Sequence, residues 1–302
     1  MKRLERKYAV LPVLIVLMSL LVCCSDQGST GSAGENETAA KGKLFIIGGG
    51  DRPAPMIKNL IEIAGVDSAG YIVILPMSSS APDTSAYYAK KQFTEQGIDN
   101  IHTFNLQSEQ QMKPSVMDSV VDAGLIYMTG GNQNRFMEIV RDTELERQIR
   151  AAYQQGSVIA GTSAGAAVMS ELMITGDERK HPEYTGNFRT IEANNIILES
   201  GLGLISQAII DQHFIKRMRM NRLISACLEH PGKVGVGIDE ATAILVEGNR
   251  AKVYGEGQVM VLRTMNQEVI IKEGLLGGQF STAIYLPGQQ FSIQPSKSKG
   301  AG

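Results

Sequence analysis

The chain has 302 residues, a formal net charge of -2 and 20% charged residues. This length allows one large hydrophobic core, and the nearly balanced charge excludes a general affinity for nucleic acid. Tryptophan is absent and aromatic residues make up 6%, which argues against a module that binds carbohydrate by ring stacking.

The N-terminus has the pattern of a secretory signal. Lysines and arginines within the first seven residues precede an apolar run over residues 8–22, an order typical of exported proteins. The run is too short to span a bilayer comfortably. It ends at Cys23 and Cys24, which resembles a bacterial lipobox. We expect residues 1–24 to be a lipoprotein-type signal peptide and Cys24 to be lipidated, which predicts a membrane anchor facing the periplasm or the cell exterior. Processing at Cys23, and cleavage without lipidation, stay open.

Cysteine is used sparingly, with three residues in the chain. If two belong to the processing site, Cys227 stands alone and the mature protein has no internal disulfide. Cys227 lies in the apolar pattern 223–228, so we expect a small core residue rather than a reactive thiol.

Two polar segments bound the folded body. Residues 25–42 consist mainly of Gly, Ser, Thr, Glu and Ala, the composition of a flexible tether. Residues 295–302 repeat this character and predict a disordered tail. No internal repeat or second linker lies between them, which predicts one domain over residues 43–294.

Within the body, short β-branched apolar runs alternate with Gly or Ser turns and helical patterns, as in a parallel sheet with crossover helices. The predicted strands are residues 44–47, 71–75, 101–104, 125–128 and 157–160. Small residues follow most of these strands, at 48–50, 78–80, 129–131 and 161–163. Because ligands bind beyond the carboxyl ends of such strands, we expect these loops to meet at one crevice.

Further strands follow towards the C-terminus. Residues 208–211 predict a strand, and residues 243–249 and 251–254 alternate in the pattern of antiparallel hairpins added to the sheet. The expected fold class is therefore α/β, a mostly parallel sheet flanked by helices with antiparallel hairpins near the C-terminus.

Residues 161–165, Gly-Thr-Ser-Ala-Gly, match G-x-S-x-G between the predicted strand 157–160 and a predicted helix over 164–173. Such a turn points the Ser163 hydroxyl into the crevice. It also places that hydroxyl at a helix N-terminus, where backbone N–H groups favour negative charge. The alternative is a small-residue turn in which Ser163 only caps the helix.

A serine hydroxyl needs a base, and histidine is the usual one. The chain has four histidines. His102 lies in a strand pattern, His181 in a polar loop, and His230 at a predicted helix end. His213 follows the strand 208–211, so its position makes it the best candidate.

At this point the sequence resembles the cyanophycinases of peptidase family S51. Four motifs match in order: the first strand and glycine loop at 44–51, the turn at 129–133, the histidine motif at 211–214 with Arg217, Arg219 and Arg222, and the acid segment at 237–240. The similarity therefore covers most of the folded body.

The resemblance implies a flavodoxin-like sheet related to class I glutamine amidotransferases. It also implies Ser163 as nucleophile, His213 as general base and Glu240 as the acid that orients His213. This order separates the chain from typical α/β-hydrolases, where the acid precedes the histidine. Asp239 is the rival acid. Neighbours in a strand face opposite sides, so only one of the two reaches His213, and the family pattern favours Glu240.

The resemblance further implies an oxyanion hole from the backbone N–H groups of Gly131 and Ala164. Cyanophycin is poly-aspartate that carries arginines on isopeptide bonds, and guanidinium groups bind carboxylates bidentately. The predicted substrate-binding residues are Gln133, Asp211, Gln212, Arg217, Arg219 and Arg222. A solvated basic face is the alternative for the three arginines.

The expected function is an exported or lipid-anchored serine exopeptidase that releases β-Asp-Arg dipeptides through an acyl-enzyme. An aspartyl dipeptidase acting on short acidic peptides and an inactive surface binding protein are the alternatives. Met218 stands where the family usually has glycine, and the polar stretch 176–194 is expected to reshape the groove. No credible metal-ligand spacing occurs, so we expect no metal or cofactor. No nucleic-acid partner is expected, and a homodimer stays open.

Overall fold

The structure is a computed structural model that describes residues 40–183, 186, 188–265 and 268–295. The predicted signal peptide, the lipidation site at Cys24 and nearly all of the predicted tether and tail lie outside these residues. Within the described ranges, no helix is both long enough and apolar enough to cross a membrane.

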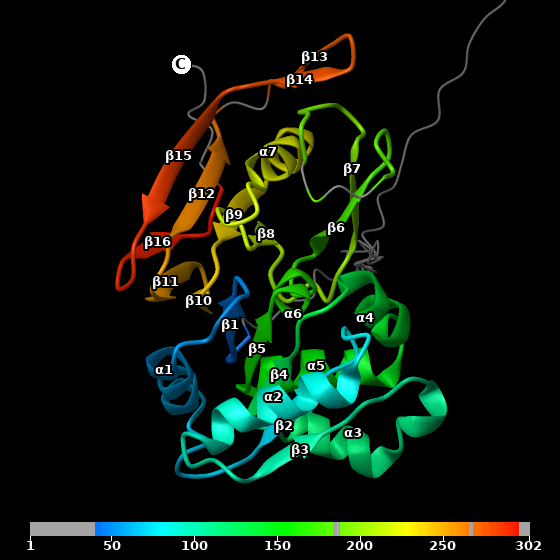
Figure 1. Cartoon of the computed structure of the whole chain (residues 1–302), viewed down its shortest axis with the longest axis vertical. Helices are drawn as coiled ribbons and strands as arrows, with labels where there is room; N and C mark the ends of the chain where they lie inside the picture. The colour runs from blue at the N-terminus through cyan, green and yellow to red at the C-terminus, as the bar shows by residue number, and fades with distance from the viewer. Residues whose placement is uncertain (1–39, 184–185, 187, 266–267, 296–302) are drawn as a thin grey trace, which may run out of the picture. The chain divides into compact units, whose positions relative to one another are not determined.

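The central feature is an eight-stranded sheet with the order β16-β11-β10-β1-β5-β4-β2-β3 (Figure 1). Its strands are β1 (Lys43–Ile47), β2 (Ile72–Leu75), β3 (Ile101–Thr103), β4 (Leu125–Met128), β5 (Val158–Thr162), β10 (Thr242–Glu247), β11 (Arg250–Gly255) and β16 (Gln290–Ser292). Strands β1 to β5 pair in parallel, whereas β10, β11 and β16 add antiparallel pairs beyond β1. The predicted α/β class with added hairpins is confirmed.

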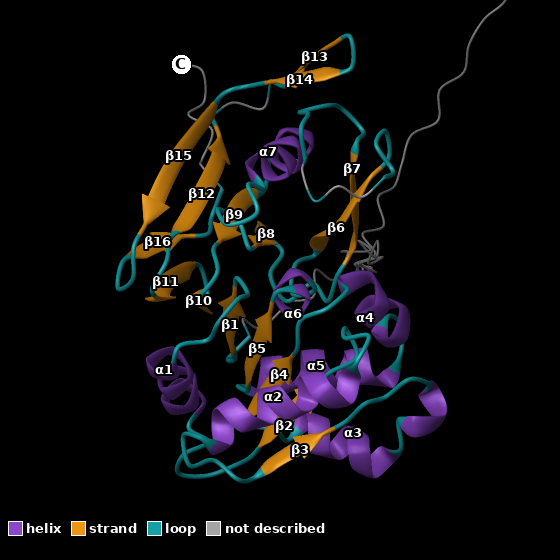
Figure 2. Cartoon of the chain, viewed as in Figure 1, coloured by secondary structure: helices purple, strands orange, loops and turns teal. Residues whose placement is uncertain are grey.

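Helices cover both faces of this sheet (Figure 2). They are α1 (Ala54–Ala64), α2 (Pro82–Thr94), the 3₁₀ helix η1 (Glu109–Gln111), α3 (Pro114–Val121), α4 (Gln133–Val140) and α5 (Glu144–Gln155). Side chains of α1 and α2 form one buried cluster with Leu125 and Tyr127 of β4. Side chains of α3, α4 and α5 form another cluster with Ile126 and Met128. Successive residues of β4 thus pack on opposite faces, and burial of both faces explains the continuous apolar runs.

A second sheet has the order β15-β12-β9-β8. It contains β8 (Ala208–Gln212), β9 (Val234–Ile238), β12 (Val259–Thr264) and β15 (Phe280–Tyr285), and helix α7 (Met220–Glu229) connects β8 to the parallel β9. The predicted hairpin over 243–249 and 251–254 joins the main sheet as β10 and β11, whereas β12 and β15 pair in this second sheet. The chain leaves β9 and enters β10 of the main sheet through residues 239–241, so the two sheets meet at Glu240.

The remaining elements are the short helix α6 (Ala164–Ala167) and two hairpins, formed by β6 (Leu172–Glu178) with β7 (Ile196–Ser200), and by β13 (Ile270–Lys272) with β14 (Leu275–Gly277). The predicted helix 164–173 is wrong beyond Ala167. The carbonyls of Val168 and Met169 accept hydrogen bonds from the amides of Leu202 and Ile205, at 2.6 and 3.1 Å. Contacts from a distant segment thus replace the next helical turn.

The predicted core position of Cys227 is confirmed. Its side chain is fully buried against the second sheet and it forms no disulfide. Burial, with a contribution from the charge of Asp211, raises the pKa of the thiol to about 12. The neutral thiol therefore acts as a small apolar side chain.

Candidate active site

Ser163 occupies a strained turn between β5 and α6. Its backbone has φ 54° and ψ -111°, a conformation that a residue with a side chain adopts only when its surroundings hold it there. The Ser163 amide donates to the carbonyl of Ile47 at 3.1 Å, which ties the turn to the end of β1. The hydroxyl makes no capping hydrogen bond to α6, so the helix-cap alternative is wrong.

His213 lies between Ser163 and Glu240. Its Nε2 is 2.9 Å from Ser163 Oγ, and its Nδ1 is 2.6 Å from Glu240 Oε1. His213 follows β8, and its amide donates to the carbonyl of Gly48 at 2.7 Å. The three side chains therefore come from the ends of β5, β8 and β9, and form one hydrogen-bonded chain where the two sheets meet.

Asp239, the rival acid, has a different partner. Its Oδ1 accepts the amide hydrogens of Ile215 and Lys216 at 3.1 and 2.9 Å. These bonds hold the loop that follows His213, while Glu240 is the carboxylate that reaches the imidazole. Asp239 thus fixes the loop that follows His213, and Glu240 forms the hydrogen bond to the imidazole ring.

Burial lowers the pKa of His213, and the charges of Arg217 and Arg219 lower it further, whereas the hydrogen bond to Glu240 opposes this shift. The hydrogen bond from His213 in turn lowers the pKa of Glu240. The favoured state is a neutral imidazole beside a carboxylate. In that state Nδ1–H donates to Glu240 and Nε2 is left to accept the proton of Ser163. The arrangement can therefore perform general-base chemistry on a serine hydroxyl.

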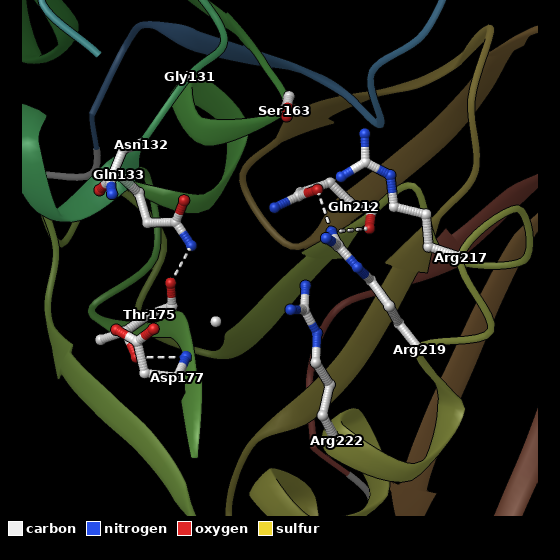
Figure 3. Close-up of a pocket in the computed structure, with 11 residues that line it drawn as sticks. Gly131, Asn132, Gln133, Ser163, Thr175, Asp177, Gln212, Arg217, Arg219 and Arg222 are labelled. Atoms are coloured by element: carbon white, nitrogen blue, oxygen red, sulfur yellow. Dashed lines mark hydrogen bonds between the residues drawn. The ribbon is translucent and has the colours of Figure 1, made fainter. Parts of the chain in front are cut away.

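A pocket of about 260 Å³ opens beside Ser163 (Figure 3). Its lining residues are Gly131, Asn132, Gln133, Ser163, Thr175, Gly176, Asp177, Gln212, Arg217, Arg219 and Arg222. Gly131 lies in this wall, and in the described part of the chain no hydrogen bond from its amide is found. Ala164 is the first residue of α6, so its N–H has no acceptor within the helix.

Arg222 is held by a buried ion pair beneath the pocket. Its Nε donates to Asp211 Oδ2 at 2.8 Å and its Nη2 donates to Asp211 Oδ1, while the guanidinium carbon lies 4.8 Å from the centre of the Phe188 ring. Asp211 does not line the pocket. The expectation that Asp211 holds the substrate is corrected, because its carboxylate is fully buried and engaged by Arg222.

The other predicted substrate-binding residues all line the pocket. Arg219 Nη1 donates to the backbone carbonyl of Gln212 at 2.8 Å and also to the side-chain oxygen of Gln212. Arg217 is exposed at the rim. Gln133 is buried, and its Nε2 donates to two backbone carbonyls of β6. No hydrogen bond to its Oε1 is found among the described residues, so this oxygen can accept one from a ligand.

Met218, the departure noted in the arginine motif, has φ 49° and is 72% exposed. The position therefore requires the left-handed conformation that glycine adopts freely, which gives a physical reason for glycine there.

Sequence reasoning missed the side of the pocket formed by Thr175, Gly176 and Asp177. The polar stretch 176–194 had indicated an altered groove, but not which of its residues line it. Among the described residues, no group of three or more His, Cys, Asp or Glu could hold a metal ion.

The model of peptidase family S51 matches residues 44–254. The chain belongs to peptidase family S51. It is 33% identical over 230 residues to cyanophycinases from Nostoc sp. (strain PCC 7120) and Trichormus variabilis, covering 74% of this chain and 74% of each relative. A crystal structure of a peptidase from an acI-B1 Actinobacterium has a TM-score of 0.62 and 23% identity, over 83% of this chain and 96% of that chain.

These similarities make the chain a serine-type peptidase. The alternative from a different functional class is an inactive surface binding protein, and it would be supported by a His213 side chain that faces away from Ser163. The observed 2.9 Å contact is the opposite arrangement.

Proposed function

We propose that the chain is an exported serine exopeptidase that hydrolyses cyanophycin to β-Asp-Arg dipeptides. The observation that carries the proposal is the hydrogen-bonded chain of Ser163, His213 and Glu240, which opens on a pocket containing Arg217, Arg219 and Arg222. The similarity to cyanophycinases supports the choice of substrate.

In this proposal, His213 Nε2 takes the proton of Ser163 while Oγ bonds to the scissile carbonyl carbon. The backbone N–H groups of Gly131 and Ala164 stabilise the negative oxygen that develops. The C–N bond then breaks, and His213 gives the proton to the leaving amine. Water attacks the resulting ester with His213 again acting as base, which releases the acyl group and restores Ser163. Glu240 keeps the imidazole oriented and stabilises its protonated form.

The arginines supply a site for the free carboxylates of the polymer. Arg222 is already oriented by two hydrogen bonds to Asp211, so little freedom is lost when it binds a carboxylate. We assign Asp211 a positioning role through Arg222 and assign Arg217, Arg219 and Arg222 to the substrate. Gln212 positions Arg219 through their shared hydrogen bonds.

Export and anchoring form a separate part of the proposal, supported by the basic start, the apolar run over residues 8–22 and Cys24. Intact mass of the mature protein from a bacterial membrane fraction tests it. We expect a diacylglycerol-modified Cys24 as the first residue, and a Cys24→Ala variant that leaves the membrane fraction. A homodimer stays an open alternative, which light scattering of the mature protein decides.

Product analysis on purified cyanophycin tests the activity. We expect the mature protein to release β-Asp-Arg dipeptide and a Ser163→Ala variant to release at least about a thousandfold less. Ser80→Ala, an exposed serine outside the pocket, is the matched control and should keep full activity. If both the wild type and Ser163→Ala leave the polymer intact while the wild type cleaves Asp-X dipeptides, the dipeptidase alternative replaces this proposal.

A further inference from the structure

Strand β6 contains an irregularity at the pocket. The register between β6 and β7 shifts between Ile174 and Glu178, and Gly176 within this segment has φ 98°. A bulge breaks the alternation of a strand and re-aims side chains, and bulges are over-represented next to active sites. Here the bulge brings Thr175, Gly176 and Asp177 to the wall of the pocket.

The bulge is held from both sides by hydrogen bonds. Gln133 Nε2 donates to the carbonyls of Ile174 and Thr175 at 2.9 and 2.6 Å. Thr175 Oγ1 donates to the carbonyl of Ile197 at 3.0 Å and accepts the amide hydrogen of Asp177 at 3.2 Å. The backbone that carries Asp177 is therefore fixed between α4 and β7.

The two sides of the pocket carry opposite charges. Figure 3 shows Arg217, Arg219 and Arg222 on one side, and Asp177 with Thr175 and Gln133 on the other. Asp177 is the one acidic residue among the described residues that line the pocket. A Cβ added at Gly176 would lie 3.8 Å from Arg222 Nη1. The two sides are thus close enough for one bound residue to meet both.

The Asp177 carboxylate is exposed and available. Its Oδ2 accepts one hydrogen bond, from Asn134 Nδ2 at 3.3 Å, and none of the ion pairs found in the described ranges involves it. Arg222, by contrast, already has Asp211 as its counter-ion. A carboxylate that forms no ion pair with the described residues, and that faces a pocket lined with arginines, favours a ligand that brings its own positive charge.

We propose that Asp177 binds the side-chain cation of the substrate residue whose carboxylate lies against the arginines. The pocket would then select residues that carry a carboxylate and a guanidinium together. This inference rests on the proposed function, because it assigns a further residue to the substrate site beside Ser163. Asp177 is a specificity residue and takes no part in bond breaking.

Steady-state kinetics on two synthetic β-aspartyl oligomers test the inference. One oligomer carries arginine, and the other carries citrulline, which has the shape of arginine without its charge. The variant is Asp177→Asn, which keeps the size of the side chain and removes its charge. For the wild type we expect a KM roughly fivefold or more lower with the arginine oligomer, the effect of one partly solvated ion pair. Asp177→Asn should raise KM for the arginine oligomer by the same factor, leaving kcat and the citrulline kinetics unchanged.

Asp67→Asn is the matched control, an exposed aspartate in the turn before β2 that does not line the pocket. It should behave as the wild type. An N-acetylated arginine oligomer separates the side-chain cation from a terminal ammonium group and should show the same fivefold response.

The inference is overturned if the wild type cleaves the arginine and citrulline oligomers equally well. It is also overturned if Asp177→Asn affects both alike, or if acetylation alone abolishes the preference. A wild type that cleaves no oligomer contradicts the proposed function itself, so the two failures are distinguishable.

Discussion

Replacing Asp211 by Asn tests the buried pair beneath the pocket. The Arg222 side chain is 2% exposed and that of Asp211 is 0% exposed. Asparagine has nearly the same size but carries no charge, so the guanidinium would stay buried without its counter-ion. Breaking a buried pair on one side costs about 3–5 kcal/mol of unfolding free energy. With a urea slope of about 2–3 kcal/mol/M, the unfolding midpoint should fall by roughly 1–2.5 M. The assay is urea unfolding followed by circular dichroism.

The double variant Asp211→Leu with Arg222→Met is the control, because it removes both charges and keeps much of the volume. Replacement of a buried pair by apolar residues is often neutral or stabilising by about 1–4 kcal/mol. The double variant should therefore be at least as stable as the wild type. It should still bind substrate poorly, because it lacks the Arg222 guanidinium. A loss below about 1 kcal/mol for Asp211→Asn, or a double variant no more stable than Asp211→Asn, would show that Arg222 does not need Asp211 as its buried counter-ion.

Three further outcomes follow from the site. Gly49→Ala should lower kcat/KM by roughly a hundredfold, because the added Cβ would lie 2.4 Å from the His213 ring. The control is Gly248→Ala, at another positive-φ glycine where an added Cβ would have nothing within 4 Å, and it should keep full activity. Since the pKa of His213 is lowered, the acid limb of the pH profile of kcat/KM should lie below about pH 6.5. Arg217→Gln removes a positive charge near His213 and should move this limb to higher pH. A movement to lower pH would contradict the expected effect of Arg217. Met218→Gly should raise the unfolding free energy by about 1 kcal/mol in urea titrations, because it relieves the left-handed backbone; an unchanged midpoint would count against that strain.

Much of the main sheet could be predicted from local signals. The strand over Leu125–Met128 was predicted with both of its ends, because a continuous apolar run bounded by small residues is typical of a strand buried on both faces. The helix over 164–173 could not be corrected from sequence. Its true end is set by hydrogen bonds from Leu202 and Ile205, and their approach depends on the tertiary fold.

In the site, too, some residues could be predicted from local sequence, whereas others depend on the tertiary fold. His213 was singled out because it follows a strand, and strand ends meet in this class of fold. Sequence could not tell whether Asp211 faces the ligand or Arg222, since that depends on how α7 packs on β8. Asp177 was missed because a bulge depends on the register with the partner strand, and no residue type marks it reliably.

Labelling of the mature protein by a fluorophosphonate reagent tests whether Ser163 is a nucleophile activated by His213. The reagent reacts with a serine hydroxyl whose proton is removed by a neighbouring base. We expect a single adduct, located on Ser163 by peptide mass spectrometry, with a rate that falls steeply in a folded His213→Ala variant. No adduct on Ser163, or an adduct that forms equally fast without His213, would show that Ser163 is not a nucleophile activated by His213.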